Sequence, residues 1–549
     1  MNRIFLGFLS GLMLLSSSAV LADDRKKGGT VTGPVIANTL IENFNPFTQQ
    51  AGANPARGFI YEPMLFHNTL RDKTEYRLAV SHEYSDDLKS VTFVLREGLK
   101  WSDGKPLTTE DVMYSHGIAK KDAKIDVYAL WQGDKPKLSA IEALDARTVR
   151  FTMAEPDSSV HGLIAAHYIV PKHIWSKEEN LVEFRNKKPV GSGPLTEIKN
   201  FKPQQMIVCR NPNYWDAGKP HVDCLKLKQF KGNDQVQTAL MRGDIDWGSN
   251  FIPDVEKTFV AKDPENNHFW YPAGPTVSIF LNTKRKPMDN LAFRQAFSMA
   301  LNRPEIVDLA TYGYASENPH ITGIGDFFRE WYDDGVNAKY DYLNKYSPEK
   351  AKALLDEAGY KDTDGDGMRE NPDGSEAKIE IMVVNGWTDW VQTVQMATEY
   401  LQEIGINART RTVEIGQLIE NFKTANYDAG ILWGDVGPTP HNVYQNVLHT
   451  KGKGVALQAN HGIYSDEMDT LLDEFTRTTD KARQREISAK LQEFVAQNLM
   501  MIPVFSNPEW YQYSTSRFEG WPTKDNPYIN PRFYDDGARA LMINNLYLK

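Results

Sequence analysis

The chain has 549 residues with 62 basic and 72 acidic side chains, which gives a formal net charge of −10. This acidic balance argues against nucleic acids and anionic membrane surfaces as partners, because both repel a negatively charged protein. The length predicts several domains, and the 12 tryptophans are many for a soluble protein. The tryptophans are therefore the first candidates for functional residues.

The first residues have the features of a secretory signal peptide. Arg3 precedes an apolar run over 4–15 that is too short for a stable membrane anchor, and Val20-Leu21-Ala22 fits a cleavage site. We expect residues 1–22 to be removed. No cysteine lies near the cleavage site and no later apolar run could cross a bilayer. The expected mature protein is therefore periplasmic, soluble and not a lipoprotein.

Strand and turn signals dominate the chain from about residue 29 to residue 250. Within this region, Cys209 and Cys224 lie in two predicted strands on either side of a loop rich in turn residues. Because an oxidising compartment allows disulfides, we expect a Cys209–Cys224 bridge. The bridge would close a loop of about fifteen residues and contribute roughly 3 kcal/mol. Two reduced thiols are the alternative.

From about residue 290 to residue 505, predicted helices alternate with predicted strands. Ser347-Pro348 starts one helix and Gly359 ends it. A strand over 378–384, a helical pattern and a strand over 406–413 then form one β-α-β unit. Such a unit implies parallel strands that are joined by a crossover helix.

The turn between this strand and its helix reads NGWTDW and covers residues 385–390. Ligands of open α/β sheets bind beyond the carboxyl ends of the strands, so this turn is a candidate binding loop. Thr388 or Asp389 can cap the helix, and Trp390 in the first helical turn is expected to pack against the lobe. Nothing local requires Trp387, which is therefore a candidate ligand platform.

Two further tryptophans adjoin glycine, proline or polar residues in the same way. Trp433 ends an apolar strand, and Trp521 lies between Gly520 and Pro522. Packing in the core is the alternative for each of them. Together the tryptophans suggest a cleft with flat apolar walls and polar edges, which suits a pyranose ring. The expected polar partners in this cleft are Asn45, Asn385, Asp389 and Asp435.

The sequence carries no signature of an enzyme. It contains no G-x-S-x-G, H-E-x-x-H, P-loop or G-x-G-x-x-G motif, and its 12 histidines lack the spacing of metal ligands. A glycosidase needs only two carboxylates that flank a sugar, so a secreted glycosidase stays a distant alternative. We therefore expect a binding protein that requires no cofactor.

The acidic stretch 362–373 resembles a calcium-binding loop. Its oxygen donors fall at positions 1, 3, 5, 9 and 12 of such a loop, and Gly367 occupies position 6. A strand follows rather than a helix, so a paired EF-hand is excluded and any calcium would be structural. An acidic turn without metal is the alternative. The candidate ligands are Asp362, Asp364, Asp366, Glu370 and Asp373.

A series of short motifs runs through nearly the whole chain after the signal peptide. In chain order they are Gly28-Gly29-Thr30, Asn45-Pro46-Phe47, Tyr61-Glu62-Pro63-Met64-Leu65, the run 95–104 (LREGLKWSDG), Gly191-Ser192-Gly193-Pro194, Asn211-Pro212-Asn213-Tyr214-Trp215, Arg242-Gly243-Asp244-Ile245-Asp246, and Phe293-Arg294-Gln295-Ala296-Phe297 followed by Asn302-Arg303. In this order the chain resembles the family 5 extracellular solute-binding proteins of ABC importers. That class includes the oligopeptide- and dipeptide-binding proteins.

The resemblance implies an α/β fold of the type II, cluster C periplasmic binding proteins. This fold has mixed sheets, two hinge-connected lobes that close on a ligand, and an extra small domain. The resemblance also implies a monomer that delivers its ligand to permease subunits in the inner membrane. The expected boundaries are 23–60, 190–289 and 506–549 for lobe I, 61–189 for the inserted small domain, and 290–505 for lobe II.

Within the family, NGWTDW and the stretch 520–528 resemble the branch that binds β-linked oligosaccharides such as cellobiose and chitooligosaccharides. By this resemblance, Trp387 and Trp521 would sandwich sugar rings. The run 433–438 differs from that of the peptide binders, because Asp435 is misplaced for meeting a ligand ammonium. It also departs from the chitooligosaccharide binders, which have an Asn at about the position of Trp433, and this departure favours glucose-type sugars. The expected function is capture of short β-linked oligosaccharides for import, and an oligopeptide- or dipeptide-binding protein is the alternative.

Overall fold

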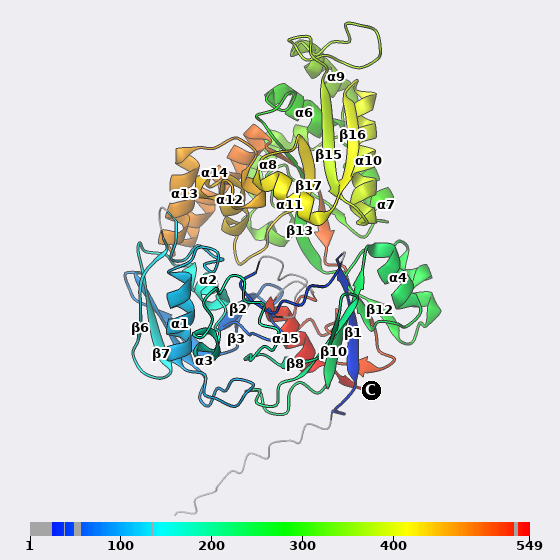
Figure 1. Ribbon diagram of the computed structural model, residues 1–549. Helices are drawn as coiled ribbons and strands as arrows, with labels where there is room; N and C mark the ends of the chain where they lie inside the picture. The colour runs from blue at the N-terminus through cyan, green and yellow to red at the C-terminus, as the bar shows by residue number, and fades with distance from the viewer. Residues whose placement is uncertain (1–24, 38, 49–55, 134–135, 532–535) are drawn as a thin grey trace, which may run out of the picture.

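The computed structural model describes residues 25–37, 39–48, 56–133, 136–531 and 536–549. The expected signal peptide over 1–22 lies outside the described residues. Figure 1 shows an upper and a lower body. The chain passes between them at Pro272 and Glu509, whose backbones form a hydrogen bond of 2.8 Å. The two lobes and their crossing segments, expected from the sequence, are confirmed.

The main sheet of the lower lobe has the order β1 (Thr30–Ile36), β10 (Cys224–Phe230), β9 (Gln205–Arg210) and β8 (Leu195–Lys202). β1 is parallel to β10, whereas β9 is antiparallel to both of its neighbours. The register sets Cys209 opposite Cys224, and the two form a disulfide with 4.0 Å between their Cα atoms. The expected bridge is confirmed.

A second sheet of the lower lobe combines distant parts of the chain. Its order is β11 (Trp247–Gly248), β19 (Gln512–Ser514) and β12 (Asn267–Phe269). β19 follows the second crossing but lies between two strands that precede the first. The lobe is therefore built from separate segments, as the resemblance implies. Its other elements are α4 (Asn233–Met241), α5 (Val255–Thr258), β20 (Phe518–Glu519), α15 (Asp536–Asn545) and β21 (Tyr547–Leu548).

The small domain forms the left part of the lower body in Figure 1. Its sheet has the order β4 (Ala79–Tyr84), β5 (Ser90–Leu95), β7 (Thr148–Met153) and β6 (Leu138–Ala143), all antiparallel. Thr108 and Asp111 form a capping box at the start of its main helix. The remaining elements are β2 (Leu65–Asn68), β3 (Lys73–Tyr76), α1 (Thr109–Ala119), α2 (Val160–Ala166) and α3 (Lys172–Trp175).

A buried carboxylate joins the small domain to the lower lobe. Glu62 is fully buried and accepts hydrogen bonds from Arg77 at 2.7 Å, from the Tyr214 hydroxyl at 2.7 Å and from the Trp215 indole at 2.7 Å. The Ser192 hydroxyl accepts from the Glu62 backbone N–H. Three motifs that are far apart in sequence thus meet here. Their side chains supply the further hydrogen-bonding partners that a buried ion pair needs. We name Glu62, Arg77, Tyr214 and Trp215 the Glu62 hub.

The upper lobe contains one sheet of six strands. Its order is β14 (Ser316–Glu317), β18 (Met501–Pro508), β13 (Ala273–Leu281), β17 (Ala429–Trp433), β15 (Lys378–Val384) and β16 (Asn407–Val413). β13 lies in the sequence range expected for lobe I, yet it pairs with β17 and β18 at the centre of this sheet. The first crossing therefore falls at Pro272 and not at residue 289, and most of β18 also lies on the upper side.

The sequence expectations for this lobe are otherwise confirmed. β15 and β16 are parallel and are joined by α10 (Thr388–Glu403). α9 (Pro348–Glu357) has Ser347 at its N-cap, and Gly359 follows its end with φ +88°. That angle favours glycine, which has no Cβ to clash.

Helices cover both faces of the upper sheet (Figure 1). Alternate strand residues face opposite ways, so Ile381 packs with α6, α7, α9 and α10, whereas Met382 packs with α11 to α14. None of the helices in the described part of the chain has the length and apolarity needed to cross a membrane. The bounds not yet given are α6 (Leu291–Ala300), α7 (Arg303–Ala310), α8 (Asp334–Tyr340), α11 (Ile415–Lys423), α12 (His441–Leu448), α13 (Asp466–Arg477) and α14 (Lys481–Asn498).

Candidate ligand-binding site

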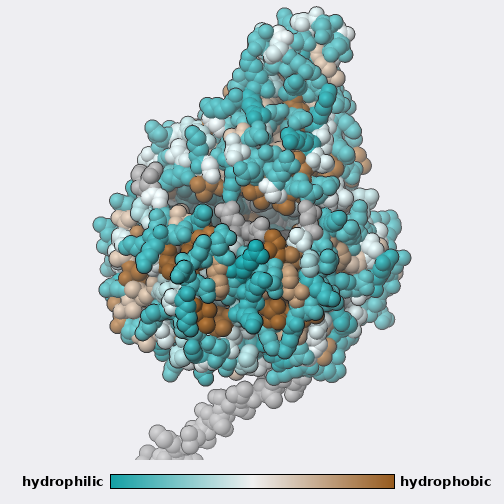
Figure 2. Space-filling view, viewed as in Figure 1, coloured by the Kyte–Doolittle hydropathy of each residue, from teal (hydrophilic) through white to brown (hydrophobic). Residues whose placement is uncertain are grey.

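The carboxyl ends of β15 and β17 face the lower lobe. β13 enters the sheet from the first crossing and runs antiparallel to β17, so β17 runs back toward the crossing and ends there at Trp433. β15 is parallel to β17 and ends beside it at Val384. The space-filling view shows the surface hollowed between the two lobes (Figure 2). The turn over 385–390 therefore lies on the side of the sheet where α/β proteins bind ligands.

Three tryptophans form a cluster at these strand ends. The ring centroid of Trp387 lies 5.1 Å from that of Trp390 and 6.1 Å from that of Trp433, and Trp390 lies 6.3 Å from Trp433. Trp390 is 5% exposed, whereas Trp387 and Trp433 are only partly buried. The supporting position expected for Trp390 is confirmed. We name these three residues the tryptophan cluster.

The backbone of the turn explains why Trp387 is held here. The N–H of Asn385 donates to Val413 O at 2.9 Å, which continues the pairing of β15 with β16. Gly386 has φ +83°, so it turns the chain in a conformation that other residues adopt at a cost. Trp387 is the N-cap residue of α10 but makes no side-chain capping bond. The expected cap at Thr388 or Asp389 is wrong, because the helix begins one residue earlier and both lie in its first turn.

The polar residues of the turn differ in their surroundings. Asn385 is exposed at the end of β15. Asp435 is partly exposed after β17, and its Oδ2 accepts from Asn446 Nδ2 at 2.8 Å. Asp389 is 3% exposed, accepts from Asn233 Nδ2 at 3.4 Å and also bonds the Trp510 side chain. Burial raises the pKa of the Asp389 carboxyl to about 7. Asn385 and Asp435 thus follow the two strands that end at the cluster, whereas Asp389 is buried against Asn233 of the lower lobe.

Two expected site residues lie apart from the tryptophan cluster. Trp521 is 3% exposed, its indole N–H donates to Ser514 O at 3.1 Å and to Phe518 O at 2.9 Å, and its ring packs on Trp247 at 5.9 Å. Asn45 is fully buried, and its Nδ2 donates to two carbonyl oxygens of the segment 181–184 at 2.8 and 2.9 Å. Both side chains meet their hydrogen-bonding needs inside the lower lobe, so the proposals below do not use them.

Asn233 and Trp510 are candidate site residues that the sequence did not suggest, and both interact with Asp389. Asn233 follows β10, which is parallel to β1, so it lies at the carboxyl end of a parallel strand in the lower lobe. The rule that ligands bind beyond the carboxyl ends of parallel strands, which selected the turn over 385–390, could also have selected Asn233. Trp510 directly follows the second crossing, is partly exposed and packs on Phe251 and Tyr271, with ring centroids 5.2 and 5.0 Å away. No local pattern marks that position.

The acidic loop assembles only part of the expected calcium site. The carboxylates of Asp362, Asp364 and Asp366 lie within 4.8 Å of one another and are exposed. Glu370 instead accepts from the backbone and hydroxyl of Thr363 at 2.7 and 2.6 Å. Asp373 pairs with Lys286. Calcium binding therefore stays a prediction, with three of the five expected ligands brought together.

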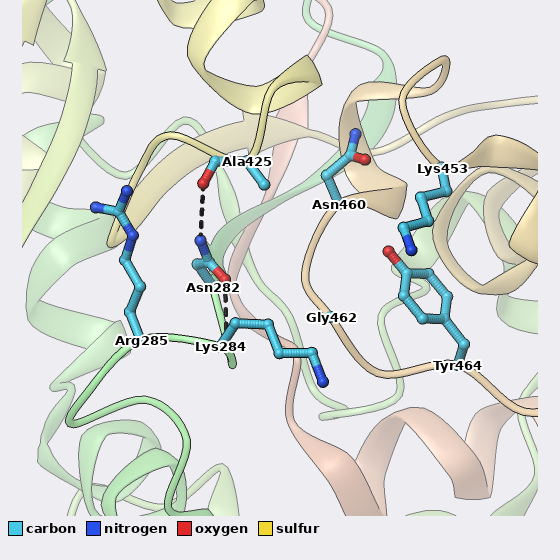
Figure 3. Close-up of a pocket in the computed structure, with 8 residues that line it drawn as sticks. All are labelled: Asn282, Lys284, Arg285, Ala425, Lys453, Asn460, Gly462 and Tyr464. Atoms are coloured by element: carbon cyan, nitrogen blue, oxygen red, sulfur yellow. Dashed lines mark hydrogen bonds between the residues drawn. The ribbon is translucent and has the colours of Figure 1, made fainter.

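Two cavities lie at the opposite end of the upper sheet. One has a volume of about 340 Å³ and is lined by Asn282 after β13, Ala425 before β17, and Lys284, Arg285, Lys453 and Tyr464. Figure 3 shows Asn282 bonded to Ala425 there. The other cavity, of about 600 Å³, lies near Lys286, Tyr360 and Asp373. Both are remote from the strand ends that carry the tryptophan cluster.

Comparisons with known proteins agree with this architecture. Residues 73–455 match the bacterial extracellular solute-binding proteins, family 5 middle. The chain is 25% identical over 546 residues to the oligopeptide-binding protein AppA of Bacillus subtilis, covering 94% of each. It superimposes with a TM-score of 0.85 on a periplasmic oligopeptide-binding protein of Thermotoga maritima with bound mannohexaose, at 29% identity, covering 96% and 99% of the two chains.

A crystal structure of the Bacillus subtilis AppA with a nonapeptide gives a TM-score of 0.79 at 21% identity, covering 96% of this chain, which supports the fold alone. Two lobes joined by crossing segments, with a candidate site between them, define the substrate-binding component of an ABC transporter. The chain belongs to family 5 of the bacterial extracellular solute-binding proteins.

Proposed function

We propose that this protein captures short β-linked oligosaccharides between its lobes, in the periplasm, and delivers them as a monomer to the permease subunits of an ABC importer. It performs no catalysis. The observation that carries the proposal is the tryptophan cluster. Two partly exposed indoles rest on a buried third one at the ends of β15 and β17.

The chemistry of the cluster fits a pyranose ring. The faces of such a ring carry C–H groups that pack on an indole, and its edge carries hydroxyls that need donors and acceptors. Asn385 and Asp435 border the indoles and offer both kinds of group. Cellobiose-like and chitobiose-like sugars both present these features. We favour glucose-type sugars, because Trp433 lies at about the position where the chitooligosaccharide binders have an Asn.

The comparisons support an oligosaccharide as well as the family. The Thermotoga maritima neighbour, which superimposes over nearly the whole chain, was crystallised with mannohexaose bound. That protein shows that this architecture accommodates a sugar chain.

A peptide ligand is the second candidate, and the names of the relatives favour it. AppA of Bacillus subtilis is an oligopeptide-binding protein. A peptide brings a charged ammonium that requires a placed carboxylate. In this structure Asp389 is buried, and Asp435 is only partly exposed with its Oδ2 bonded to Asn446. A sugar hydroxyl needs a single acceptor from Asp435, whereas an ammonium has three N–H groups to satisfy, so we rank the peptide second.

Calorimetric titration with cellobiose, chitobiose and a tripeptide separates these candidates. We expect heat and a rise in melting temperature with cellobiose, because a ligand that binds only the folded state stabilises it. Heat with the tripeptide and none with either sugar would overturn the proposal. Incubation with cellobiose and an assay for reducing ends tests the absence of hydrolysis, and released glucose would contradict it.

Replacing Trp387 tests the platform itself. We expect Trp387→Ala to weaken cellobiose binding at least tenfold, or about 1.4 kcal/mol. The matched control is Trp331→Ala, which removes another partly buried indole of the upper lobe, one that packs against Arg485 and Phe475. The control is expected to bind within twofold of the parent. Equal affinities for all three proteins would remove Trp387 from the site.

A further inference from the structure

The turn that carries Trp387 meets the lower lobe at residues 231–233, and Asn233 forms hydrogen bonds across this contact. The backbone N–H of Asn233 donates to Gly386 O at 3.1 Å. Its side-chain Nδ2 lies 3.3 Å from Thr388 Oγ1 and 3.4 Å from Asp389 Oδ1. The backbone and the side chain of one lower-lobe residue thus bond three neighbours of Trp387. We name Asn233, Gly386, Thr388 and Asp389 the junction.

Two glycines let the lobes approach this closely. A Cβ added to Gly232 would lie 2.9 Å from Gly386 O, and a Cβ added to Gly386 would lie 3.0 Å from Lys231 O. The first distance is shorter than side chains tolerate, and the atom it meets is backbone, which cannot swing away. The junction is therefore a contact between main chains, with hydrogen bonds across it.

Asp389 lies where three parts of the chain meet. Its carboxylate interacts with Asn233 of the lower lobe, with the Trp510 side chain of the crossing segment and with the backbone N–H groups of Asp389 and Trp390 in its own helix. All of these donors are uncharged. The charged residues beside these contacts are Lys231 and Asp234, which are exposed and flank Gly232 and Asn233, and Glu509, which precedes Trp510. A carboxylate that is buried among neutral donors pays a large desolvation cost when it ionises.

We propose that Asn233 and Asp389 are positioning residues that clamp the Trp387 turn to the lower lobe when the lobes close, so that ligand capture is coupled to protonation of Asp389. The inference rests on the proposed function only for the choice of ligand. When the lobes separate, Asn233 moves away and water reaches the carboxylate of Asp389, which then titrates with its ordinary pKa. Closure buries Asp389 again, and burial favours the neutral acid.

The coupling has a definite sign. A closed state that holds a proton which the open state has released is favoured as the pH falls. Because burial raises the pKa of Asp389 to about 7 in this structure, the effect covers neutral pH. A ligand that binds the closed state therefore binds more tightly at pH 6 than at pH 8. We expect the dissociation constant for cellobiose to be about fivefold to tenfold lower at pH 6 than at pH 8. This change is smaller than the limit of tenfold per pH unit that the uptake of one proton sets.

The first experiment compares the ligand-free and the cellobiose-saturated protein. Intrinsic tryptophan fluorescence of the parent is followed from pH 5 to pH 9, because Trp390 and Trp510 both contact Asp389. We expect a step near pH 7 in the saturated parent, no step in this range without cellobiose, and no step in the nearly isosteric Asp389→Asn under either condition. The matched control Asp234→Asn removes an exposed acid next to Asn233 and is expected to keep the step. A saturated parent without the step, or a step that survives in Asp389→Asn, would overturn the inference.

The second experiment measures cellobiose affinity at pH 6 and pH 8. The parent and Asp234→Asn are expected to show the fivefold to tenfold difference, and Asp389→Asn to show none. Asn233→Ala keeps the carboxylate but removes the clamp, so it is expected to bind several-fold more weakly at both pH values. A parent whose affinity is independent of pH would refute the coupling. Tripeptide binding that shows the same pH difference, with no binding of cellobiose, would support the junction and refute the proposed ligand instead.

Discussion

The Glu62 hub and the junction at Asp389 both bury a carboxylate beside tryptophan, but they treat its charge in opposite ways. Glu62 is fully buried and faces the guanidinium of Arg77 at 2.7 Å, and two arginines lie over the ring of Trp215 at 5.0 and 4.1 Å. Asp389 is 3% exposed and meets only neutral donors. The hub compensates its charge within one body, whereas the junction lies where two bodies meet.

This difference separates a structural site from a functional one. A buried ion pair with all its partners in place holds its parts in one arrangement, and losing one partner leaves an uncompensated charge. A buried carboxylate without a cation stores free energy that a change of conformation or protonation can release. The family resemblance rests on motifs that build the hub, while the proposed ligand chemistry lies at the other site.

The largest expected effect is on the hub. We expect Arg77→Met to lower the free energy of unfolding by about 3–5 kcal/mol, because it leaves Glu62 charged and unpaired. Urea unfolding measures the loss. The control Arg150→Met breaks the exposed pair with Glu142, which is 3.2 Å long, and is expected to cost about 0–1 kcal/mol. Similar losses in the two variants would erase the distinction between the hub and an ordinary surface pair.

A smaller effect, with a dependence on pH, is expected at the junction. Between the ordinary pKa of 3.8 and about 7, folded protein keeps a proton on Asp389 that the unfolded chain has released. The contribution of this group to stability therefore falls as the pH rises through that window and is constant above it. A shift of about three units corresponds to at most about 4 kcal/mol.

Thermal or urea unfolding of the parent and Asp389→Asn at pH 5 and pH 8 measures this contribution. We expect the variant to gain stability relative to the parent as the pH rises, because its amide carries no charge to bury. Asp435→Asn, which alters a partly exposed acid after β17, is expected to show no such trend. A difference between parent and Asp389→Asn that is the same at both pH values would place the carboxylate in a merely structural role.

The smallest expected effect concerns Trp521, a tryptophan that the sequence suggested for the site. Trp521→Phe removes the indole N–H that donates to Ser514 O and Phe518 O, which leaves both carbonyls without that donor. We expect a loss of about 1–3 kcal/mol in unfolding free energy and a cellobiose affinity within twofold of the parent. A tenfold loss of affinity with unchanged stability would return Trp521 to the ligand site.

Local patterns predicted the part of the fold that local forces determine. The β15–α10–β16 unit follows from apolar residues at strand and helix spacing, and its turn follows from the change between the two periods. The cysteine pair was predictable for a similar reason, because short strands around one loop bring its ends together. These elements contain within a few dozen residues the contacts that stabilise them.

Non-local contacts explain where the sequence failed. β13 was expected in the lower lobe, but its partners β17 and β18 follow it by about 150 residues or more, beyond any local pattern. Trp433 and Trp521 both lie beside glycine, yet one rests partly exposed at a strand end and the other is buried against Trp247. Whether an indole lines a site or fills a core depends on partners from other segments, and so does the junction at Asn233.

The contact of Gly232 with Gly386 gives the cleft a fixed dimension. Where side chains separate two lobes, a single substitution resizes the gap, and related proteins can adapt to larger or smaller ligands at that point. Here main-chain atoms meet directly, and a Cβ on Gly232 would lie 2.9 Å from Gly386 O. The closest approach of the lobes at this end is set by the polypeptide itself, so a substitution that changes the width of the closed cleft must lie elsewhere.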